Sequence, residues 1–326
     1  MQRFLLVKTS SLGDVVHCLP AATDIAANFP GCRIDWVVEE AYVDIVGLHP
    51  AVSRILPVAV RRWRKSLFRR GTAAQVAAFR ARFDPEGYDR IIDVQGLAKS
   101  ALIARLARGE RHGLDRKSAR ESIACLTYHR VHAVPWTLDA VARNRTLVGS
   151  ALGYAVQGAP DYGIRADAAD APWLPQGAYC VCLTGTTDAA KLWPEDRWGA
   201  LGRRAREAGL SCVLPAGTET ERKRAERIAA EIGAAVVAPP LDLGALTRVL
   251  AGAALAVGVD TGLTHLAAAL GRPTAGVYCG TSPAATGVIA ALACNVGDVA
   301  RTPTADAVWE AAREVLDRAL AANGAP

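Results

Sequence analysis

The feature that most constrains the fold is a repeated alternation of short apolar runs and longer segments with helical spacing. The alternation starts at residues 3–8, pauses in a stretch rich in Gly, Pro, Ala and Asp at 153–175, and restarts at residue 179. Strands that alternate with helices are typical of parallel sheets covered by helices on both faces. The 326 residues suffice for about two domains. We therefore predict an α/β protein with two doubly wound, Rossmann-like domains that face each other across a cleft.

The apolar spacing also places the individual elements. Pro20 lies in the first turns of the first expected helix, where it predicts an irregular start or a kink. The segment that follows Arg120 shows no clear periodicity. In the first half we expect strands at 3–8, 33–38, 55–58 and 90–94 and helices at 14–25, 98–106 and 138–152. In the second half we expect strands at 179–183, 211–214, 235–237, 253–257 and, last, 274–277, with helices at 195–208, 219–232, 243–250, 266–270 and 305–322.

These elements divide the chain into four parts. The first domain is expected at 1–160, a linker at 161–177 and the second domain at 178–300. The remaining residues, 301–326, contain a helix that we expect to pack back towards the first domain.

Composition narrows the class of protein. A content of 51% hydrophobic and 21% charged residues is ordinary for a globular chain, and the net charge of +6 favours anionic partners. The eight cysteines form no CxxC pair, and neither their spacing nor that of the histidines fits a zinc site. We expect reduced thiols in a cytoplasmic protein without a metal. No signal peptide and no apolar stretch of ~20 residues is visible, so membrane contact is expected to be peripheral.

A strand that turns into a helix over Asp260-Thr261-Gly262-Leu263 predicts an anion site. The first N–H groups of a helix have no partner within it, and the helix dipole adds positive potential there. Asp260 would repel a bound phosphate, so its carboxylate is expected to serve something else, such as sugar hydroxyls or a nearby lysine. The alternative is that Asp260 or Thr261 only caps the helix.

The first half offers two further candidate sites. Asp14 follows the first strand, and open α/β sheets bind ligands at the carboxyl ends of their strands. The alternative for Asp14 is a helix N-cap. The second candidate is the basic cluster Arg61, Arg62, Arg64 and Lys65 with Trp63, Leu67 and Phe68 interleaved. A cluster of this kind is typical of a solvated surface, of a surface for acidic lipid or saccharide, or of a nucleic-acid site, although no nucleic-acid motif accompanies it.

Two common nucleotide-binding classes are disfavoured. Neither half has GxGxxG after a strand, as a dinucleotide dehydrogenase would, and GxxxxGK[ST], the mark of a P-loop kinase, is absent from the sequence.

Six motifs follow one another along the chain. They are Lys8-Thr-Ser-Ser-Leu-Gly-Asp14, Trp36-Val-Val-Glu-Glu40, Arg61-Arg-Trp-Arg-Lys65, Asp93-Val-Gln-Gly-Leu-Ala-Lys-Ser100, Lys191-Leu-Trp-Pro194 and Asp260-Thr-Gly-Leu-Thr-His265. Each motif is weak alone, but the ordered set covers nearly the whole chain and resembles the ADP-heptose transferases of lipopolysaccharide biosynthesis, glycosyltransferase family 9, which have the GT-B fold. Within that family, the basic cluster and the Asp-Val-Gln-Gly segment indicate the enzyme that acts on Kdo rather than the one that acts on the heptosylated core.

The resemblance implies an inverting transfer of L-glycero-D-manno-heptose from ADP-heptose to the first Kdo of Kdo2-lipid A, with no metal and no other cofactor. It makes Asp14 the general base and Lys191 the cation that neutralises the departing ADP. The second domain would bind the donor and the first domain the acceptor. The implied donor residues are Thr186, Thr187, Lys191, Glu221, Asp260, Thr261, Gly262, Leu263 and His265, and the implied acceptor residues are Arg61, Arg62, Arg64, Lys65, Lys99 and Arg120.

The implied acceptor lies in the inner leaflet of the inner membrane, so we expect a peripheral protein on its cytoplasmic face and no nucleic-acid partner. Alternatives remain open. They are an enzyme acting on the heptosylated core, a sugar-nucleotide epimerase on the same scaffold, and a non-catalytic lipid- or nucleic-acid-binding protein.

Overall fold

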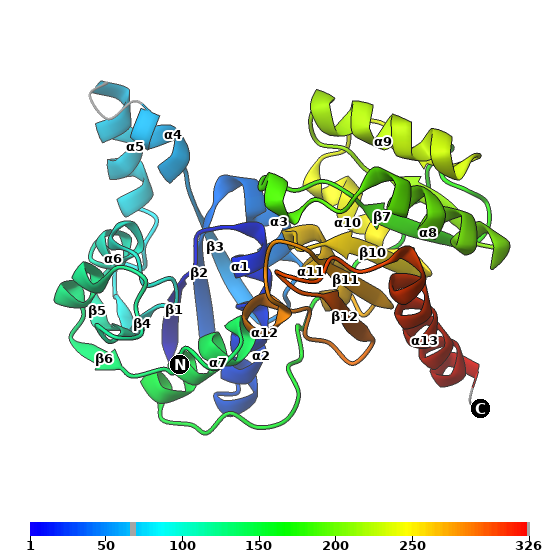
Figure 1. Cartoon of the computed structure of the whole chain (residues 1–326). Helices are drawn as coiled ribbons and strands as arrows, with labels where there is room; N and C mark the ends of the chain where they lie inside the picture. Colours follow the sequence, from blue (N-terminus) through cyan, green and yellow to red (C-terminus); the bar gives the residue numbers. More distant parts are fainter. Residues whose placement is uncertain (66–69, 325–326) are drawn as a thin grey trace. The chain divides into compact units, whose positions relative to one another are not determined.

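The chain divides into two compact units. The computed structural model describes residues 1–65 and 70–324 (Figure 1). The units are Met1–Ile164 and Arg165–Pro326, and the boundary falls within residues 153–178, which form neither helix nor strand. The division therefore lies in the segment whose composition indicates a linker.

The first unit is a six-stranded parallel sheet with the strand order β3-β2-β1-β4-β5-β6. This is the order of a doubly wound nucleotide-binding fold, with a topological switch point between β1 and β4. Its strands are β1 (Arg3–Val7), β2 (Arg33–Glu39), β3 (Val52–Val58), β4 (Tyr88–Asp93), β5 (Gly109–Leu114) and β6 (Arg130–His132). Its α-helices are α1 (Leu12–Val16), α2 (Leu19–Asn28), α3 (Val43–Gly47), α4 (Val60–Lys65), α5 (Arg70–Arg80), α6 (Ala98–Ala104) and α7 (Ala140–Leu152), with 3₁₀ turns η1 (Glu40–Tyr42) and η2 (Ser122–Thr127).

The second unit repeats the same order, β12-β11-β10-β7-β8-β9, again all parallel. Its switch point lies between β7 and β10. The strands are β7 (Tyr179–Leu183), β8 (Ser211–Leu214), β9 (Val236–Val237), β10 (Leu255–Val259), β11 (Thr274–Tyr278) and β12 (Ala293–Gly297). The helices are α8 (Glu195–Glu207), α9 (Glu219–Ile232), α10 (Leu243–Ala251), α11 (Gly262–Ala269), α12 (Pro283–Thr286) and α13 (Ala305–Gly324), with a 3₁₀ turn η3 (Ala189–Lys191). The prediction of two doubly wound sheets is confirmed.

Three strands of the structure were not predicted from the sequence pattern. The strands β5, β6 and β12 were not expected, and the strand at 274–277 is not the last one. β6 and β12 are edge strands, and β5 has the polar sequence Gly-Glu-Arg-His-Gly-Leu. Such strands form because they pair with a buried neighbour, so their own residues carry little strand signal.

The first expected helix is two helices. α1 ends at Val16 and α2 begins at Leu19, with Pro20 in its first turn. Proline suits that position because its missing N–H would have no helical partner there. The irregular start that Pro20 predicts is confirmed.

One face of the second sheet is covered by α8, α9 and α13, whose apolar side chains form one core with alternate residues of the strands. Trp193 and Trp198 are fully buried there with their rings nearly perpendicular, 5.0 Å apart. α13 packs on α8 and on β10 to β12 of its own unit. Its packing towards the first unit stays a prediction.

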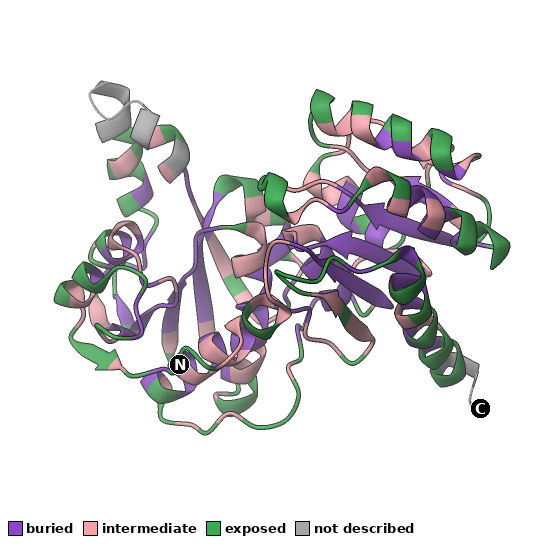
Figure 2. Cartoon of the chain, in the orientation of Figure 1, coloured by how far each residue is buried: buried purple, intermediate pink, exposed green. Residues whose placement is uncertain are grey.

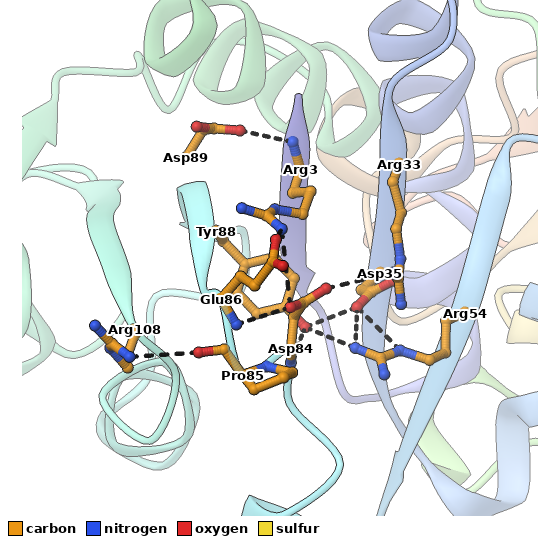
Figure 3. A network of polar contacts seen from close by, with 10 residues as sticks. All are labelled: Arg3, Arg33, Asp35, Arg54, Asp84, Pro85, Glu86, Tyr88, Asp89 and Arg108. Carbon is orange, nitrogen blue, oxygen red and sulfur yellow. Dashed lines mark hydrogen bonds and ion pairs between the residues drawn. The ribbon is translucent and has the colours of Figure 1, made fainter. Parts of the chain in front are cut away.

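The amino ends of the first sheet are tied together by a buried carboxylate. Asp35 on β2 is fully buried and accepts hydrogen bonds from Arg54 on β3 (2.5 Å) and from the Tyr88 hydroxyl on β4 (2.7 Å), as Figure 3 shows. Arg33 adds a third donor at 3.2 Å. Burial and the bond to Asp35 raise the pKa of Tyr88 to about 12, so its hydroxyl remains a donor. The network links β2, β3 and β4 at the edge opposite the carboxyl ends of the strands.

We predict that Arg54→Met lowers the free energy of unfolding, because it removes a cation from a buried carboxylate. Since Arg54 is itself partly exposed and solvent screens the pair, we expect a loss of only ~1–3 kcal/mol. Urea denaturation measures the change. Lys223→Met is the control, since it breaks an exposed ion pair with Glu219 and should cost under about 0.5 kcal/mol. Equal losses in the two variants would contradict this role of the network.

Candidate active site

The Asp260-Thr261-Gly262-Leu263 motif forms the amino end of α11 at the switch point of the second sheet. Thr261 is the N-cap of α11 and makes no side-chain capping bond. The Thr264 hydroxyl instead donates to the Val259 carbonyl at 2.7 Å, which fixes the turn from β10. Gly258 permits this contact, because a Cβ there would lie 2.2 Å from the Thr264 hydroxyl. The first N–H groups of the helix are thus arranged to bind an anion.

Asp260 is buried beside this helix start and is held by residues from two other loops. Lys191 Nζ lies 2.8 Å from Asp260 Oδ2, and the Thr281 hydroxyl donates to the same oxygen at 2.7 Å. His265 Nε2 lies 3.6 Å from Oδ1. Asp260 therefore does not cap α11. Its contact with Lys191 is one of the two roles that the sequence allowed.

These contacts keep Asp260 ionised. Burial alone would raise the pKa of its carboxyl, because a charge loses its hydration. The interactions with His265, Lys191 and Thr281 more than offset burial and hold that pKa below its ordinary value. The result is a lysine and a carboxylate of fixed geometry next to an anion-binding helix end.

The loop that carries Lys191 is anchored on both sides. Trp193 is buried, and its Nε1 donates to the Pro303 carbonyl at 2.9 Å. On the other side, a Cβ at Gly280 would lie 2.4 Å from the Ala190 carbonyl, so only glycine lets the turn after β11 approach η3 so closely. The Trp-Pro part of the motif and Gly280 thus position Lys191.

The remaining predicted donor residues lie at the same edge of the sheet. Thr186 and Thr187 follow β7 and are half-buried and exposed, respectively. Glu221 belongs to the first turn of α9, where its Oε2 accepts the N–H groups of Gly217 (2.9 Å) and Thr218 (3.0 Å). Its Oε1 lies beside Gly185, where a Cβ would be 2.7 Å away. Glu221 is therefore a capping residue of α9 that also borders the β7 loop.

Asp14 lies at the switch point of the first sheet and is not an N-cap. Ser11 is the N-cap of α1, and Asp14, three residues on, accepts the Ser11 N–H (2.9 Å) and hydroxyl (3.0 Å) with Oδ2. Its Oδ1 lies 3.8 Å from Lys8 Nζ. Burial acts to raise the pKa of Asp14. Lys8, Ser11 and Arg120 together lower it below its ordinary value, so the carboxyl is ionised at neutral pH.

The loop that follows β4 contacts the segment between β1 and α1, which leads to Asp14. Lys99 Nζ donates to the Ser10 hydroxyl at 3.2 Å, and Lys8 Nζ to the Val94 carbonyl at 3.2 Å. The Gln95 amide donates to the Ser10 carbonyl at 2.5 Å and accepts from Thr9. The structure thus brings Asp14 and Lys99 to one place, with Arg120 close enough to influence the charge of Asp14.

The loop itself depends on a buried acid at the end of β4. Asp93 accepts bonds from the Tyr128 hydroxyl (2.7 Å), the Ser100 hydroxyl (2.8 Å) and the Gln95 N–H (2.9 Å). Burial raises the pKa of Asp93 despite these donors. Asp93 therefore holds the turn that presents Gln95 and Lys99.

The basic cluster lies on α4. Arg62 is exposed and pairs with Glu40 at 3.0 Å. Trp63 packs against the core, with its ring 5.9 Å from that of Phe79, and donates to Gln75 at 2.8 Å. The indole is therefore partly buried by packing, and its part in a ligand surface stays a prediction. Leu67 and Phe68, and the side chains of Arg61, Arg64 and Lys65, lie outside the described part of the chain.

Sequence reasoning missed Lys8, Gln95 and Thr281 as site residues. Each is a polar residue that directly follows a buried parallel strand or its first turn residues, and that position is the signal that would have found them. Among the described residues, no group of three His, Cys, Asp or Glu side chains is arranged to hold a metal ion. Nor is any helix in the described ranges long and apolar enough to span a bilayer.

Comparison with known proteins agrees with this architecture. The model of glycosyltransferase family 9 (heptosyltransferase) matches residues 76–312. The lipopolysaccharide heptosyltransferase 1 of Pseudomonas aeruginosa is 47% identical over 298 residues, which are 90% of this chain and 83% of that protein. The structure of Escherichia coli heptosyltransferase WaaC with ADP aligns with a TM-score of 0.83 and 40% identity, over 99% of this chain and 100% of that one. The structure of the same enzyme with ADP-2-deoxy-2-fluoro heptose aligns with a TM-score of 0.81 and 39% identity, over 99% of this chain and 100% of that one.

The two parallel doubly wound units, together with the alignment over nearly the whole chain with a heptosyltransferase, give the GT-B fold of a glycosyltransferase. The matches in sequence and structure go further: the chain belongs to glycosyltransferase family 9, the heptosyltransferases.

We predict that Asp260→Asn lowers stability at pH 7 by ~1–3 kcal/mol. Because the folded pKa of Asp260 is below the unfolded value of ~3.9, its contribution is fully present above that value and is lost as pH falls through the folded pKa. The difference in the free energy of unfolding between wild type and variant should therefore become smaller below about pH 4. Urea denaturation at pH 3–7 measures it, with Asp317→Asn, an exposed carboxylate on α13, as the control. A difference that does not change with pH would contradict the assignment.

Proposed function

We propose that this enzyme transfers L-glycero-D-manno-heptose from ADP-heptose to the first Kdo of Kdo2-lipid A, with inversion at the sugar carbon and without a metal or other cofactor. The observation that carries the proposal is the similarity, over nearly the whole chain, to an enzyme whose structure contains an ADP-heptose analogue. The anion-binding end of α11 beside Lys191 and Asp260 supports it, because a sugar diphosphate needs positive charge at the phosphates and polar groups at the sugar.

In the proposed donor site, the N–H groups at Thr261, Gly262 and Leu263 bind the diphosphate, and Thr186 and Thr187 add hydroxyl donors. Lys191 neutralises the charge that develops on ADP as the bond from the sugar carbon to the phosphate oxygen breaks. Asp260 then faces heptose hydroxyls with its remaining acceptor capacity, and His265 stays beside it. Glu221, fixed as a cap of α9, borders the ribose. A lysine and a helix end here take the role that a metal ion has in other sugar-nucleotide enzymes.

In the proposed acceptor site, Asp14 is the general base. The acceptor hydroxyl oxygen attacks the anomeric carbon from the face opposite the diphosphate, ADP leaves with the bonding electrons, and the hydroxyl proton passes to Asp14. Asp14 suits this step because it is ionised, both bonds from Ser11 go to Oδ2, and Oδ1 lies 3.8 Å from Lys8 Nζ. Lys8 and Lys99 hold positive charge around it without neutralising the carboxylate by a short ion pair.

The acceptor carries carboxylates and phosphates, which match the guanidinium and ammonium groups of Arg61, Arg62, Arg64, Lys65, Lys99 and Arg120. Since such an acceptor is anchored in a membrane, we propose that the enzyme works in the cytoplasm at the inner membrane as a peripheral protein, and that nucleic acid is not a partner.

A transfer assay separates this proposal from its rivals. ADP-heptose is incubated with Kdo2-lipid A, with the heptosylated product of that reaction, or with no acceptor. Transfer to the first acceptor supports the proposal, and transfer to the second alone assigns the enzyme to the next step. A changed sugar without an acceptor indicates an epimerase, and absence of nucleotide-sugar binding by calorimetry indicates a non-catalytic protein.

We predict that Asp14→Ala lowers kcat by roughly 10²–10⁴-fold and leaves the affinity for ADP-heptose nearly unchanged, because the base acts only in the transfer step. Steady-state kinetics and calorimetry measure the two quantities. Ser11→Ala is the control, since it removes one donor to Asp14 and keeps the carboxylate.

The pH profile adds a second readout for the same assignment. Lys8 lowers the pKa of Asp14, so Lys8→Met should raise that pKa and move the acid limb of the kcat profile to higher pH. Full activity of Asp14→Ala, or a limb that does not move, would refute Asp14 as the base.

We predict that the triple variant Arg61→Gln, Arg62→Gln, Arg64→Gln raises the KM for the acceptor by roughly tenfold or more, because hydrogen bonds to charged groups are lost. The KM for ADP-heptose should stay within about twofold of the wild-type value. Initial rates with each substrate varied in turn give both constants. A matched variant replaces the exposed second-unit arginines Arg203, Arg313 and Arg318. An equal rise in both KM values would refute an acceptor role for the cluster.

A further inference from the structure

The first unit exposes a group of large apolar side chains that its core does not use. Leu102 on α6 is 59% exposed, and Ile123 and Leu126 on η2 are 61% and 75% exposed. We call these three residues the apolar ridge. Single exposed apolar residues are normal, but several on adjoining elements mark a surface for interaction.

The ridge follows from the geometry of two neighbouring elements. Side chains three residues apart in a 3₁₀ helix lie one above the other, so Ile123 and Leu126 share one face while Ala124 between them is buried. η2 packs on α6, and Glu121 Oε2 accepts the Ala98 N–H at 2.7 Å, which joins the two elements at their starts. The ridge is therefore a fixed part of the surface. Figure 2 shows how much of this edge of the first unit, around α6 and β6, is exposed.

Positive charge surrounds the ridge. Residues 96–132 contain eight Lys and Arg against three Asp and Glu. All three acids are already engaged. Glu121 accepts a backbone N–H, Asp115 accepts the N–H groups of Lys117 and Ser118, and Glu110 pairs with Arg90 (3.1 Å) and Arg130 (3.2 Å). The exposed basic residues nearby are Arg105, Arg116, Lys117 and Arg120. Apolar side chains rimmed by Arg and Lys match an anionic lipid surface, whereas the centres of protein interfaces are depleted in Lys.

The same helix connects the ridge to the site around Asp14. Lys99, Leu102 and Arg105 follow one another at intervals of three residues, so they form a row along the accessible side of α6, whose other residues are mostly buried. Lys99 at the start of this row donates to Ser10. A lipid touching Leu102 would therefore lie about one helical turn from a residue of the proposed acceptor site.

We propose that the apolar ridge is the membrane-docking surface of this enzyme, with Leu102, Ile123 and Leu126 entering the boundary between headgroups and acyl chains and the surrounding Arg and Lys contacting anionic phospholipid. This inference rests on the proposed function, which supplies a lipid-anchored acceptor.

Binding to vesicles tests the surface directly. The full chain is sedimented with vesicles of phosphatidylethanolamine containing phosphatidylglycerol. We expect the double variant Ile123→Ser, Leu126→Ser to bind roughly tenfold more weakly, because two large apolar side chains no longer leave water. The matched control is Leu320→Ser, which removes an equally exposed (61%) leucine from α13 in the second unit and should bind as wild type does. The proposal is overturned if the double variant binds the vesicles as tightly as the wild type, or if the wild type does not bind them.

A kinetic test distinguishes failure of this inference from failure of the proposed function. We expect the double variant to raise the KM for Kdo2-lipid A in vesicles while keeping wild-type kinetics with a water-soluble acceptor that lacks acyl chains. If the wild type transfers heptose to both acceptors and the variant matches it on vesicles, the ridge assignment fails and the function stands. If the wild type transfers to neither acceptor, the function fails, and the vesicle experiment alone decides the ridge. A dimeric wild type that the double variant makes monomeric in sedimentation velocity would instead assign the ridge to contact between two copies.

Discussion

The candidate site in each unit depends on one topological constraint, the point in its parallel sheet where the strand order reverses. At that point the loops that leave two adjacent strands separate to opposite faces, which leaves room for a ligand between polar residues. β1 and β4 meet in this way in the first unit, and β7 and β10 in the second. The contacts of Lys8 with Val94, of Gln95 with Thr9 and of Lys191 with Asp260 all join loops at these two points. A different strand order would separate these residues, whatever their sequence motifs.

Both switch points pair a lysine with an aspartate, but the pairing differs in strength. Asp260 has Lys191 at 2.8 Å and two further neighbours, so its charge is compensated and its geometry is fixed. Asp14 has Lys8 only at 3.8 Å and two bonds from Ser11 on its other oxygen. Asp260 is thus held firmly beside the start of α11, whereas the Asp14 oxygen that faces Lys8 is held less tightly. This difference is consistent with the different roles that we propose for the two carboxylates.

The fold alone does not define the activity, since two doubly wound units serve many reactions. The particular side chains on the strand ends, and the similarity to heptosyltransferases over nearly the whole chain, define the family. The basic cluster on α4 and the apolar ridge on α6 and η2 both belong to the first unit. That unit therefore carries the surface features that the proposed charged, lipid-anchored acceptor would contact, while the second unit carries the helix start that we propose as the anion site.

The sequence by itself determined the two doubly wound sheets and the motifs at the strand ends, and it indicated a linker within residues 153–175, because apolar periodicity and Gly-containing turns are local signals. It did not determine β5, β6 and β12, which form by pairing with buried neighbours. It left Asp14 open between base and N-cap, and the structure places Ser11 at the cap. It suggested that Trp63 belongs to a ligand surface, and only the structure shows that the indole is partly buried and packs on Phe79. The partners of Asp260 were likewise decided only by the tertiary structure, because Lys191 and Thr281 come from loops 69 and 21 residues away in the chain. Burial and long-range contacts are properties of the assembled sheet, so no local pattern of residues encodes them.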